Sequence, residues 1–145
     1  MSTSSIEEIE EQIVDEFNMF DDWMQKYEYI IDLGKNLPLI DHMYKDEEHI
    51  VKGCKSKVWL NAEESSGRIN FTADSDAIIT KGLIALLIRV LSNQKPEDIA
   101  NARLEFLNKI GMKEHLSPNR ANGLIAMIDK MKKSAKSYLE SKRNN

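Results

Sequence analysis

One cysteine is the residue in this sequence best suited to chemistry. Cys54 is the only cysteine among 145 residues, and Gly53 precedes it. A glycine permits the left-handed backbone of a sharp turn. Lys52, Lys55 and Lys57 place positive charge close to the sulfur, and positive charge favours the thiolate over the thiol. The pattern indicates a nucleophilic thiol on a basic loop, although most free cysteines are buried and inert.

Two runs in which apolar and polar residues alternate follow this cysteine, and the structure they form must position it. Apolar and polar residues alternate through residues 58–62 and again through residues 69–73, on either side of a polar segment, residues 63–67, that ends in glycine. Such runs predict an antiparallel hairpin with one apolar face. Ile50 and Val51 are expected to add a short third strand, which places Cys54 in the loop between the first and second strands.

The residues before the hairpin have the apolar spacing of helices. Apolar residues recur three and four apart from Ile6 to Phe20, and eight acids with no lysine or arginine occupy residues 1–22. This predicts an amphipathic helix with a solvated acidic face. Asp22 is expected to cap a second helix, with Gln25 as its capping-box partner, and that helix should end near Gly34.

More helices are expected after the hairpin. Residues 74–76, Asp-Ser-Asp, should cap a helix over residues 78–91 that is apolar on nearly all sides and therefore central. Gly82 inside that helix is tolerable if it allows another backbone to approach closely. Pro96 predicts the start of a short helix, and another helical piece should end at Gly111. Ser117 and Pro118 predict the start of a last helix with a basic outer face, for which the acidic first helix offers a complement.

Composition limits the classes of function. The chain has a net charge of −4, so a nucleic acid is not an expected partner, because phosphate binding needs a basic surface. No signal peptide is evident, and the longest apolar stretch, residues 83–90, is too short to span a bilayer. A lone cysteine fits a reducing compartment, and we expect a cytoplasmic protein.

Together, the predicted strands and helices indicate one α+β domain over residues 1–145, with its core at about 6–141. It should consist of a small antiparallel sheet, of about three strands, covered on one side by helices.

Other cysteine chemistry is less well supported by the sequence. His42, His49 and His115 are scattered and form no metal-binding spacing with Cys54, so we expect neither a metal site nor any other cofactor. No glycine-rich phosphate loop follows a strand. A cysteine hydrolase or transferase would need a histidine folded close to Cys54 as a base, for which His115 and His49 are the candidates, and this alternative stays open. An adaptor module in which the cysteine is incidental is a second alternative.

The residues around Cys54 resemble the signature of the SufE family of sulfur acceptors, Gly-Cys-x-Ser-x-Val-Trp, which residues 53–59 match position by position. The likeness extends over roughly residues 20–130, with further matches in the same order at residues 23–34, 37–38, 74–77, 81–83 and 115–120. The acidic N-terminal extension and the basic tail depart from the family pattern without touching the cysteine stretch.

The resemblance implies a fold shared with IscU-type scaffolds and a function in sulfur transfer. Cys54 would accept persulfide sulfur from a pyridoxal-phosphate cysteine desulfurase of the SufS type, and the chain would stimulate that enzyme without turnover of its own. The pyridoxal phosphate belongs to the desulfurase, so this chain would need no cofactor. The sulfur would pass to iron–sulfur assembly, with a SufB-type scaffold as a candidate recipient. Gly53, Lys52, Lys55 and Arg120 are candidate loop or docking residues.

Overall fold

Two antiparallel strands form the sheet of the protein. In the computed structural model, which describes residues 5–53 and 56–143, β1 (Val58–Ser65) pairs with β2 (Arg68–Ser75) along their whole length. Ser66 and Gly67 join them, with φ of 55° and 80°, the backbone that a two-residue hairpin turn requires. The hairpin is confirmed, and its turn is tighter than the polar segment 63–67 indicated.

The expected third strand is reduced to a single antiparallel bridge between Ile50 and Trp59. Two backbone hydrogen bonds flank this bridge: the Val51 N–H donates to Val58 O at 2.8 Å, and the Leu60 N–H donates to His49 O at 2.9 Å. Turns on both sides prevent a longer strand. Asp46 Oδ1 accepts the His49 N–H at 3.1 Å before the bridge, and residues 52–53 turn away after it.

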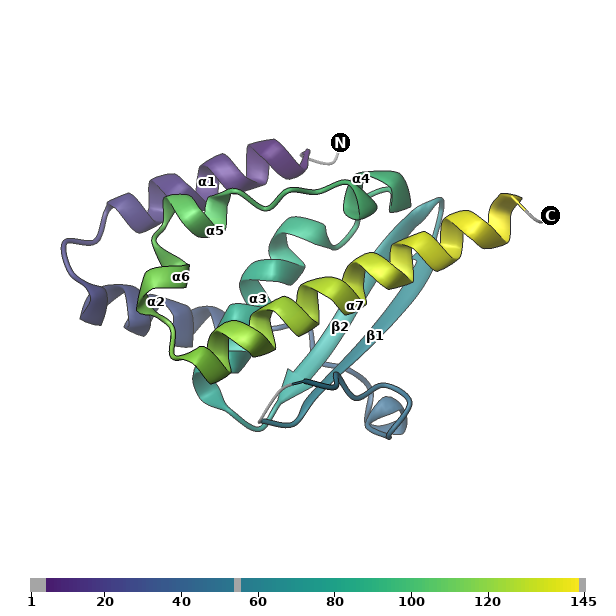
Figure 1. Ribbon diagram of the computed structural model, residues 1–145, viewed down its shortest axis with the longest axis horizontal. Helices are drawn as coiled ribbons and strands as arrows, with labels where there is room; N and C mark the ends of the chain where they lie inside the picture. The colour runs from purple at the N-terminus through teal and green to yellow at the C-terminus, as the bar shows by residue number, and fades with distance from the viewer. Residues whose placement is uncertain (1–4, 54–55, 144–145) are drawn as a thin grey trace.

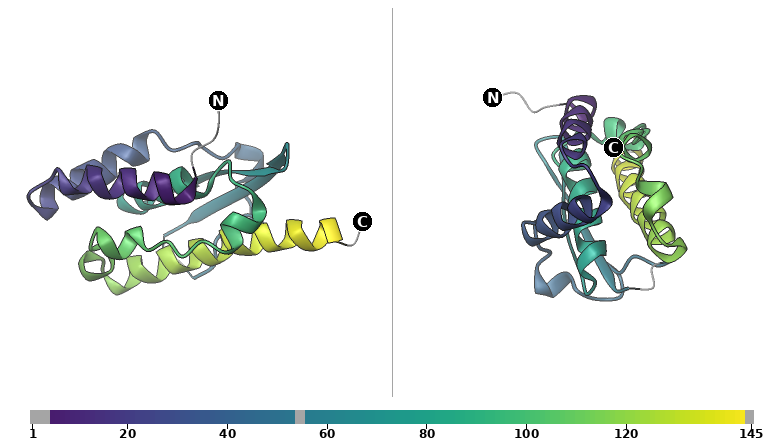
Figure 2. Two further views of the ribbon diagram at one scale, coloured as in Figure 1. Left: turned by 90° about the horizontal axis from the view of Figure 1, so that it is seen from above. Right: turned by 90° about the vertical axis from the view of Figure 1, so that its left-hand side faces the viewer.

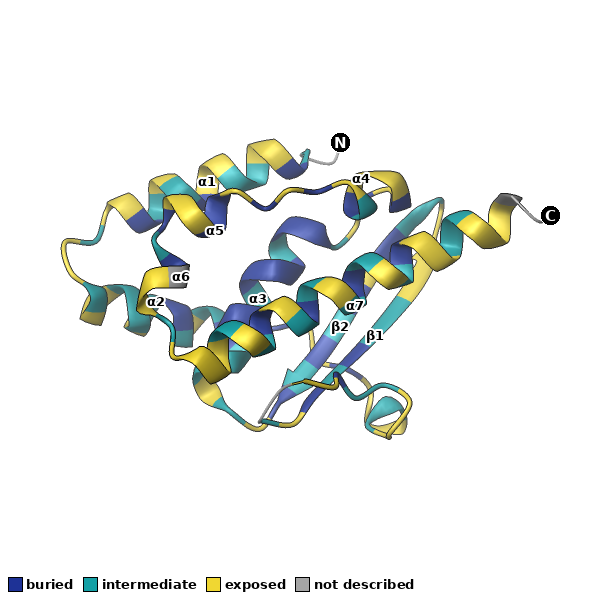
Figure 3. Cartoon of the chain, viewed as in Figure 1, coloured by how far each residue is buried: buried dark blue, intermediate teal, exposed yellow. Residues whose placement is uncertain are grey.

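Helix α3 (Ile78–Leu91) lies at the centre of the molecule, as its apolar sequence predicts. Figure 1 shows the helix behind α7 (Pro118–Arg143), and Figure 2 shows it between α7 and the pair α1 (Ile6–Asn18) and α2 (Trp23–Lys35). Helix α3 is buried along most of its length, whereas α1 and α7 each keep an exposed outer face (Figure 3). An α+β class with helices packed around a small antiparallel sheet is thus confirmed.

The start of α3 differs from the prediction that residues 74–76 cap it. Strand β2 continues through Ser75, so Asp74 belongs to the sheet, and the N-cap is Ala77, which has no side-chain cap. Ser75 Oγ accepts the Ala77 N–H at 3.2 Å. Asp74 instead binds Lys45 and Lys81, at 2.6 and 3.3 Å, and thereby joins three segments of the chain.

Gly34 and Gly82 lie at the closest approach of α2 and α3. A Cβ on Gly82 would stand 2.1 Å from the Ile30 carbonyl oxygen, and a Cβ on Gly34 would stand 2.9 Å from the Gly82 nitrogen. The close approach predicted for Gly82 is therefore present. Helix α2 ends at Lys35, next to Gly34, as predicted, and the close packing of the two helices also requires a glycine at position 34.

The acidic helix α1 contacts α3 instead of serving as the electrostatic complement of α7. Ser5 and Glu8 form a capping box at its start, and Ile13 and Phe17 are buried. Glu16 forms a two-point ion pair with Arg89 of α3, at 2.8 and 2.5 Å. Among the described residues no ion pair joins α1 to α7, because α1 packs against α3 and α5 (Phe106–Lys109).

Short helices connect the core to α7. They are α4 (Pro96–Ala100), α5 and α6 (Met112–His115). Helix α4 begins at Pro96 as predicted, and α6 follows Gly111. Earlier in the chain, a 3-10 turn, η1 (His42–Tyr44), precedes the Ile50 bridge. Helix α7 then begins at Pro118, with the Ser117 hydroxyl accepting the Arg120 N–H at 3.3 Å. The starts of α4 and α7 are confirmed, and α7 crosses the molecule diagonally in Figure 1.

Candidate functional site

Residues 51–57, called here the cysteine loop, leave and re-enter the fold at adjacent points. Val51 and Val58 are buried and joined by a backbone hydrogen bond, so the two ends of the loop meet. Residues 48–51 and 58–60 form the stem of this loop. Cys54 and Lys55 lie outside the described residues, so the surroundings of the site are defined by its neighbours in the chain.

The start of α3 holds the second end of the cysteine loop. The Lys57 N–H donates to Asp76 Oδ1 at 3.1 Å, and the Asp76 N–H donates to Lys57 O at 3.2 Å. Both hydrogen bonds use the backbone of Lys57, and its side chain is exposed. Asp76 therefore fixes the path of the chain just after Ser56.

Helix α7 contacts the first end of the cysteine loop. Gly53 has a φ of +96°, a left-handed backbone that favours glycine, and a Cβ added there would stand 3.4 Å from Ala126 Cβ, which is van der Waals distance. One turn further along α7, Lys130 Nζ donates to the carbonyl oxygen of Ile50 at 2.9 Å and approaches that of Glu48 at 3.4 Å. The loop thus lies beside one face of α7.

A cavity of about 670 Å³ opens next to Ser56, between the starts of α3 and α7. Its lining combines polar residues with apolar ones, which include Val58, Leu83, Ile84, Leu124 and Met127. Arg120 and Asn119 contribute polar groups from the first turn of α7, and Ser117 contributes its hydroxyl from just before that turn. The structure therefore brings Arg120, distant in sequence from the cysteine, to a cavity that Ser56 also lines.

Positive charge gathers at the first end of the loop. Lys52 is exposed, and its charge acts on the half-buried Lys130. Burial, and secondly the charge of Lys52, lower the pKa of Lys130 below the ordinary lysine value. The predicted basic setting of the site therefore includes a lysine from the last helix as well as Lys52.

The two histidines considered as catalytic bases each have other ring partners. His115 stacks on Trp23, with ring centroids 3.8 Å apart and planes at 14°, and its Nδ1 lies 3.0 Å from Gly111 O. His49 Nδ1 lies 2.7 Å from Asp46 Oδ1. These contacts position both imidazole rings within the fold.

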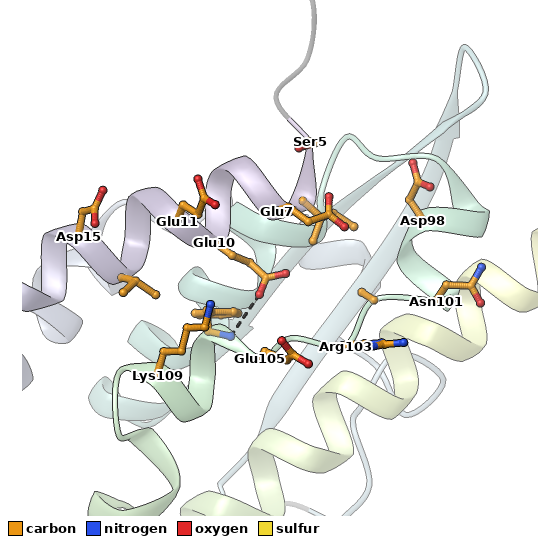
Figure 4. A pocket seen from close by; sticks show the side chains of 14 residues that line it. Ser5, Glu7, Glu10, Glu11, Asp15, Asp98, Asn101, Arg103, Glu105 and Lys109 are labelled. Carbon is orange, nitrogen blue, oxygen red and sulfur yellow. Dashed lines mark hydrogen bonds between the residues drawn. The ribbon is translucent and has the colours of Figure 1, made fainter.

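A second cavity, of about 710 Å³, lies between α1 and the α4–α5 segment (Figure 4). Acidic side chains dominate its rim. Glu10 has a structural partner there, since its carboxylate accepts the Phe106 N–H at 3.2 Å at the start of α5. Burial is the main cause that raises the pKa of Glu10 above the ordinary glutamate value. This groove shares none of its lining residues with the cavity beside Ser56.

Within residues 5–53 and 56–143, no group of three or more histidine and carboxylate side chains is placed to hold a metal ion. None of the described helices has both the length and the apolar character needed to cross a membrane.

Three residues of this site were not singled out from the sequence. The sequence indicates Asp76 as part of a helix cap and Lys130 as part of the basic outer face of the last helix, and no sequence pattern marks Ala126. Lys130 lies 80 residues from Ile50, so no local pattern connects them. Only the helical spacing of apolar residues in α7 hints at the position of Lys130. It places residues 127 and 131 on the buried face and residue 130 at the edge of that face.

Comparison with known proteins agrees with this combination of fold and cysteine loop. The family described as "SufE: Fe-S metabolism associated domain" matches residues 11–135. An uncharacterized SufE-like protein of Rhizobium meliloti (strain 1021) is 38% identical over 89% of this chain and 96% of its own length. A chloroplastic/mitochondrial SufE-like protein 1 of Arabidopsis thaliana is 38% identical over 86% of this chain, which corresponds to 34% of that longer protein.

Solved structures show the same fold. The solution structure of a hypothetical protein from Thermus thermophilus superposes with a TM-score of 0.76, covering 91% of this chain and 96% of that one at 18% sequence identity. The fold is α+β, and the family match over residues 11–135 associates the chain with iron–sulfur metabolism. The chain belongs to the SufE family.

Proposed function

We propose that this protein is a sulfur acceptor that carries persulfide sulfur on Cys54. The observation that carries the proposal is the position of the cysteine within the family signature, on a loop whose two ends are held by α3 and α7. A cysteine desulfurase of the SufS type supplies the sulfur, and the chain acts as its partner and activator without independent catalytic turnover. It needs no cofactor of its own, because pyridoxal phosphate acts on the desulfurase.

The transfer is an exchange between a thiolate and a persulfide. The Cys54 thiolate attacks the terminal sulfur of the persulfide on the desulfurase cysteine, the sulfur–sulfur bond of that persulfide breaks, and the desulfurase cysteine leaves as a thiolate. One sulfur–sulfur bond forms and one breaks, so no oxidant or reductant is needed. With one cysteine in the chain, no second thiol of the same molecule can displace the sulfur.

The surroundings of the loop support this chemistry. Lys52 and Lys130 bring positive charge to the first end of the loop, and positive charge favours the attacking thiolate. The cavity beside Ser56 lies next to the loop and has both apolar and polar lining residues, and Arg120 at its rim is a candidate contact for the desulfurase. The onward acceptor is an iron–sulfur assembly scaffold, for which a SufB-type protein is the candidate.

Mass spectrometry tests the proposal directly. The protein is incubated with a SufS-type desulfurase and cysteine, and its intact mass is measured before and after reduction. We expect a reducible gain of about 32 Da, one sulfur atom, in the wild type and no gain in Cys54→Ser. A gain that persists in Cys54→Ser would overturn the assignment of Cys54, and the absence of any gain in the wild type would overturn the function.

A further inference from the structure

Lys130 is a half-buried cation that carbonyl groups satisfy. Its Nζ lies 2.9 Å from Ile50 O and 3.4 Å from Glu48 O. No carboxylate in residues 5–53 or 56–143 forms an ion pair with it. Burying an ammonium without an opposing charge costs free energy, and a nearby lysine, Lys52, adds repulsion. An apolar side chain at this position would avoid both costs, so stability alone is a poor explanation for a lysine here.

The contacts of Lys130 fall on the part of the chain that leads into the cysteine loop. Ile50 forms the bridge to Trp59, and the next residue, Val51, donates its N–H to Val58 O. Ala126, one helical turn before Lys130, faces Gly53. Helix α7 therefore contacts residues 48–53 at two successive points, through an ammonium group and through a small side chain that allows close approach.

We propose that Lys130 is a positioning residue for sulfur transfer: by binding the carbonyl groups of Glu48 and Ile50 it fixes the stem of the cysteine loop against α7. Asp76, in the segment just before α3, holds the other end of the loop, so the two contacts together set where the loop begins and ends. The role of Lys130 in sulfur transfer rests on the proposed sulfur-acceptor function. Its effect on the stability of the stem does not, and it can be measured in the isolated protein.

Hydrogen exchange of the isolated protein is the first measurement. In Lys130→Met, which keeps the aliphatic side chain but removes all three donors, we expect the Val51 and Leu60 amides to exchange about tenfold faster, the effect of one lost charge-assisted hydrogen bond. Core amides of α3, such as that of Leu87, should keep their rates. Lys133→Met, an exposed position on the same helix, is the matched control and should leave all these rates unchanged.

Desulfurase assays are the second measurement. Lys130→Met should lower the maximal rate of sulfur loading several-fold, while the concentration that gives half-maximal stimulation stays within about twofold. Lys130→Arg, which restores donors and charge, should recover most of the loading rate. Unchanged exchange, or unchanged loading despite faster exchange, would overturn the positioning role. If the wild type itself takes up no sulfur, the proposed function fails, and the exchange rates still decide whether Lys130 fixes the stem.

Discussion

Lys57 and Asp76 bind each other through two hydrogen bonds that close the second end of the cysteine loop. The Asp76 carboxylate accepts the Lys57 N–H at 3.1 Å, and the Asp76 N–H donates to Lys57 O at 3.2 Å. Nineteen residues separate the pair in sequence, and the whole β1–β2 hairpin lies between them. The hairpin thus brings the start of the central helix back to the loop that carries Cys54.

Removing this carboxylate should loosen the end of the loop. For Asp76→Ala we expect a loss of about 1 kcal/mol in the free energy of unfolding, because the Lys57 N–H loses its acceptor. Asp76→Asn keeps an acceptor oxygen and should lose less. Chemical denaturation measures both, and hydrogen exchange of the Lys57 amide localises the change. Glu140→Ala, at an exposed site on α7, is the control, and equal stability in Asp76→Ala and wild type would contradict the prediction.

Substitution of Gly82 should destabilise the fold strongly. In Gly82→Ala the new Cβ would meet the Ile30 carbonyl oxygen at 2.1 Å, so α2 and α3 must separate. Overpacking of this kind costs about 3 kcal/mol or more, which thermal unfolding would show as a lower Tm. Gly67→Ala provides the comparison: its Cβ would meet nothing within 4 Å, and only the positive φ, at a cost of about 1 to 2 kcal/mol, opposes it. A smaller loss for Gly82→Ala than for Gly67→Ala would contradict the packing argument.

The ion pair between Glu16 and Arg89 should make stability depend on acidity. The hydrogen bonds from Arg89 are the main cause that lowers the pKa of Glu16 below its ordinary value of 4.5. The folded protein therefore binds this proton less readily than the unfolded chain. The stabilisation is complete above about pH 4.5 and is lost as the pH falls through the lower folded pKa.

Comparison of the wild type with Glu16→Gln across pH tests this assignment. The variant should have a Tm lower by about 4 °C at pH 7, and the difference should shrink as the solution is acidified below about pH 4. Glu11→Gln, an exposed position on the same helix, should follow the wild type at every pH. A Tm difference that is constant with pH would exclude Glu16 as the titrating group.

Positive charge beside the loop should speed alkylation of Cys54. In Lys52→Gln we expect iodoacetamide to react about twofold to fivefold more slowly at neutral pH, the effect of losing a charge worth about 0.5 to 1 kcal/mol in a solvated setting. The difference should vanish at high pH, where the thiol is ionised in both proteins. Lys35→Gln, an exposed lysine of α2, is the control. Equal rates at neutral pH would remove Lys52 from the account of reactivity.

Arg120 should affect encounter with the desulfurase and leave folding unchanged. Its side chain is exposed, and its contribution to the start of α7 is the backbone N–H, which donates to the Ser117 hydroxyl. Arg120→Ala should therefore keep its Tm within about 2 °C, since exposed substitutions change stability by less than about 0.5 kcal/mol. If Arg120 docks the desulfurase, the half-saturating concentration of the protein in the stimulation assay rises several-fold. A large fall in Tm would instead assign Arg120 to the fold.

The sequence alone determined the elements of this protein and the residue to examine first. Periods of two and of 3.6 are set by local backbone geometry, so they identified the hairpin, the buried central helix and the amphipathic last helix. The family signature singled out Cys54 in the same way, because its residues are adjacent in the chain. A local pattern does not show what a residue contacts far away in the sequence: Gly34 lies near a helix end as predicted but also packs against Gly82, and Asp76 holds Lys57 instead of capping α3.

The tertiary structure decided which distant residues meet at the cysteine loop. Lys130, Ala126 and Arg120 come from α7, and Asp76 comes from the segment just before α3, so their contacts depend on how α3 and α7 pack against the hairpin. It also paired the acidic first helix with Arg89 instead of with the basic last helix. Burial of apolar faces sets these crossings, and a side chain at the edge of a buried face finds its partner only after the helices have packed.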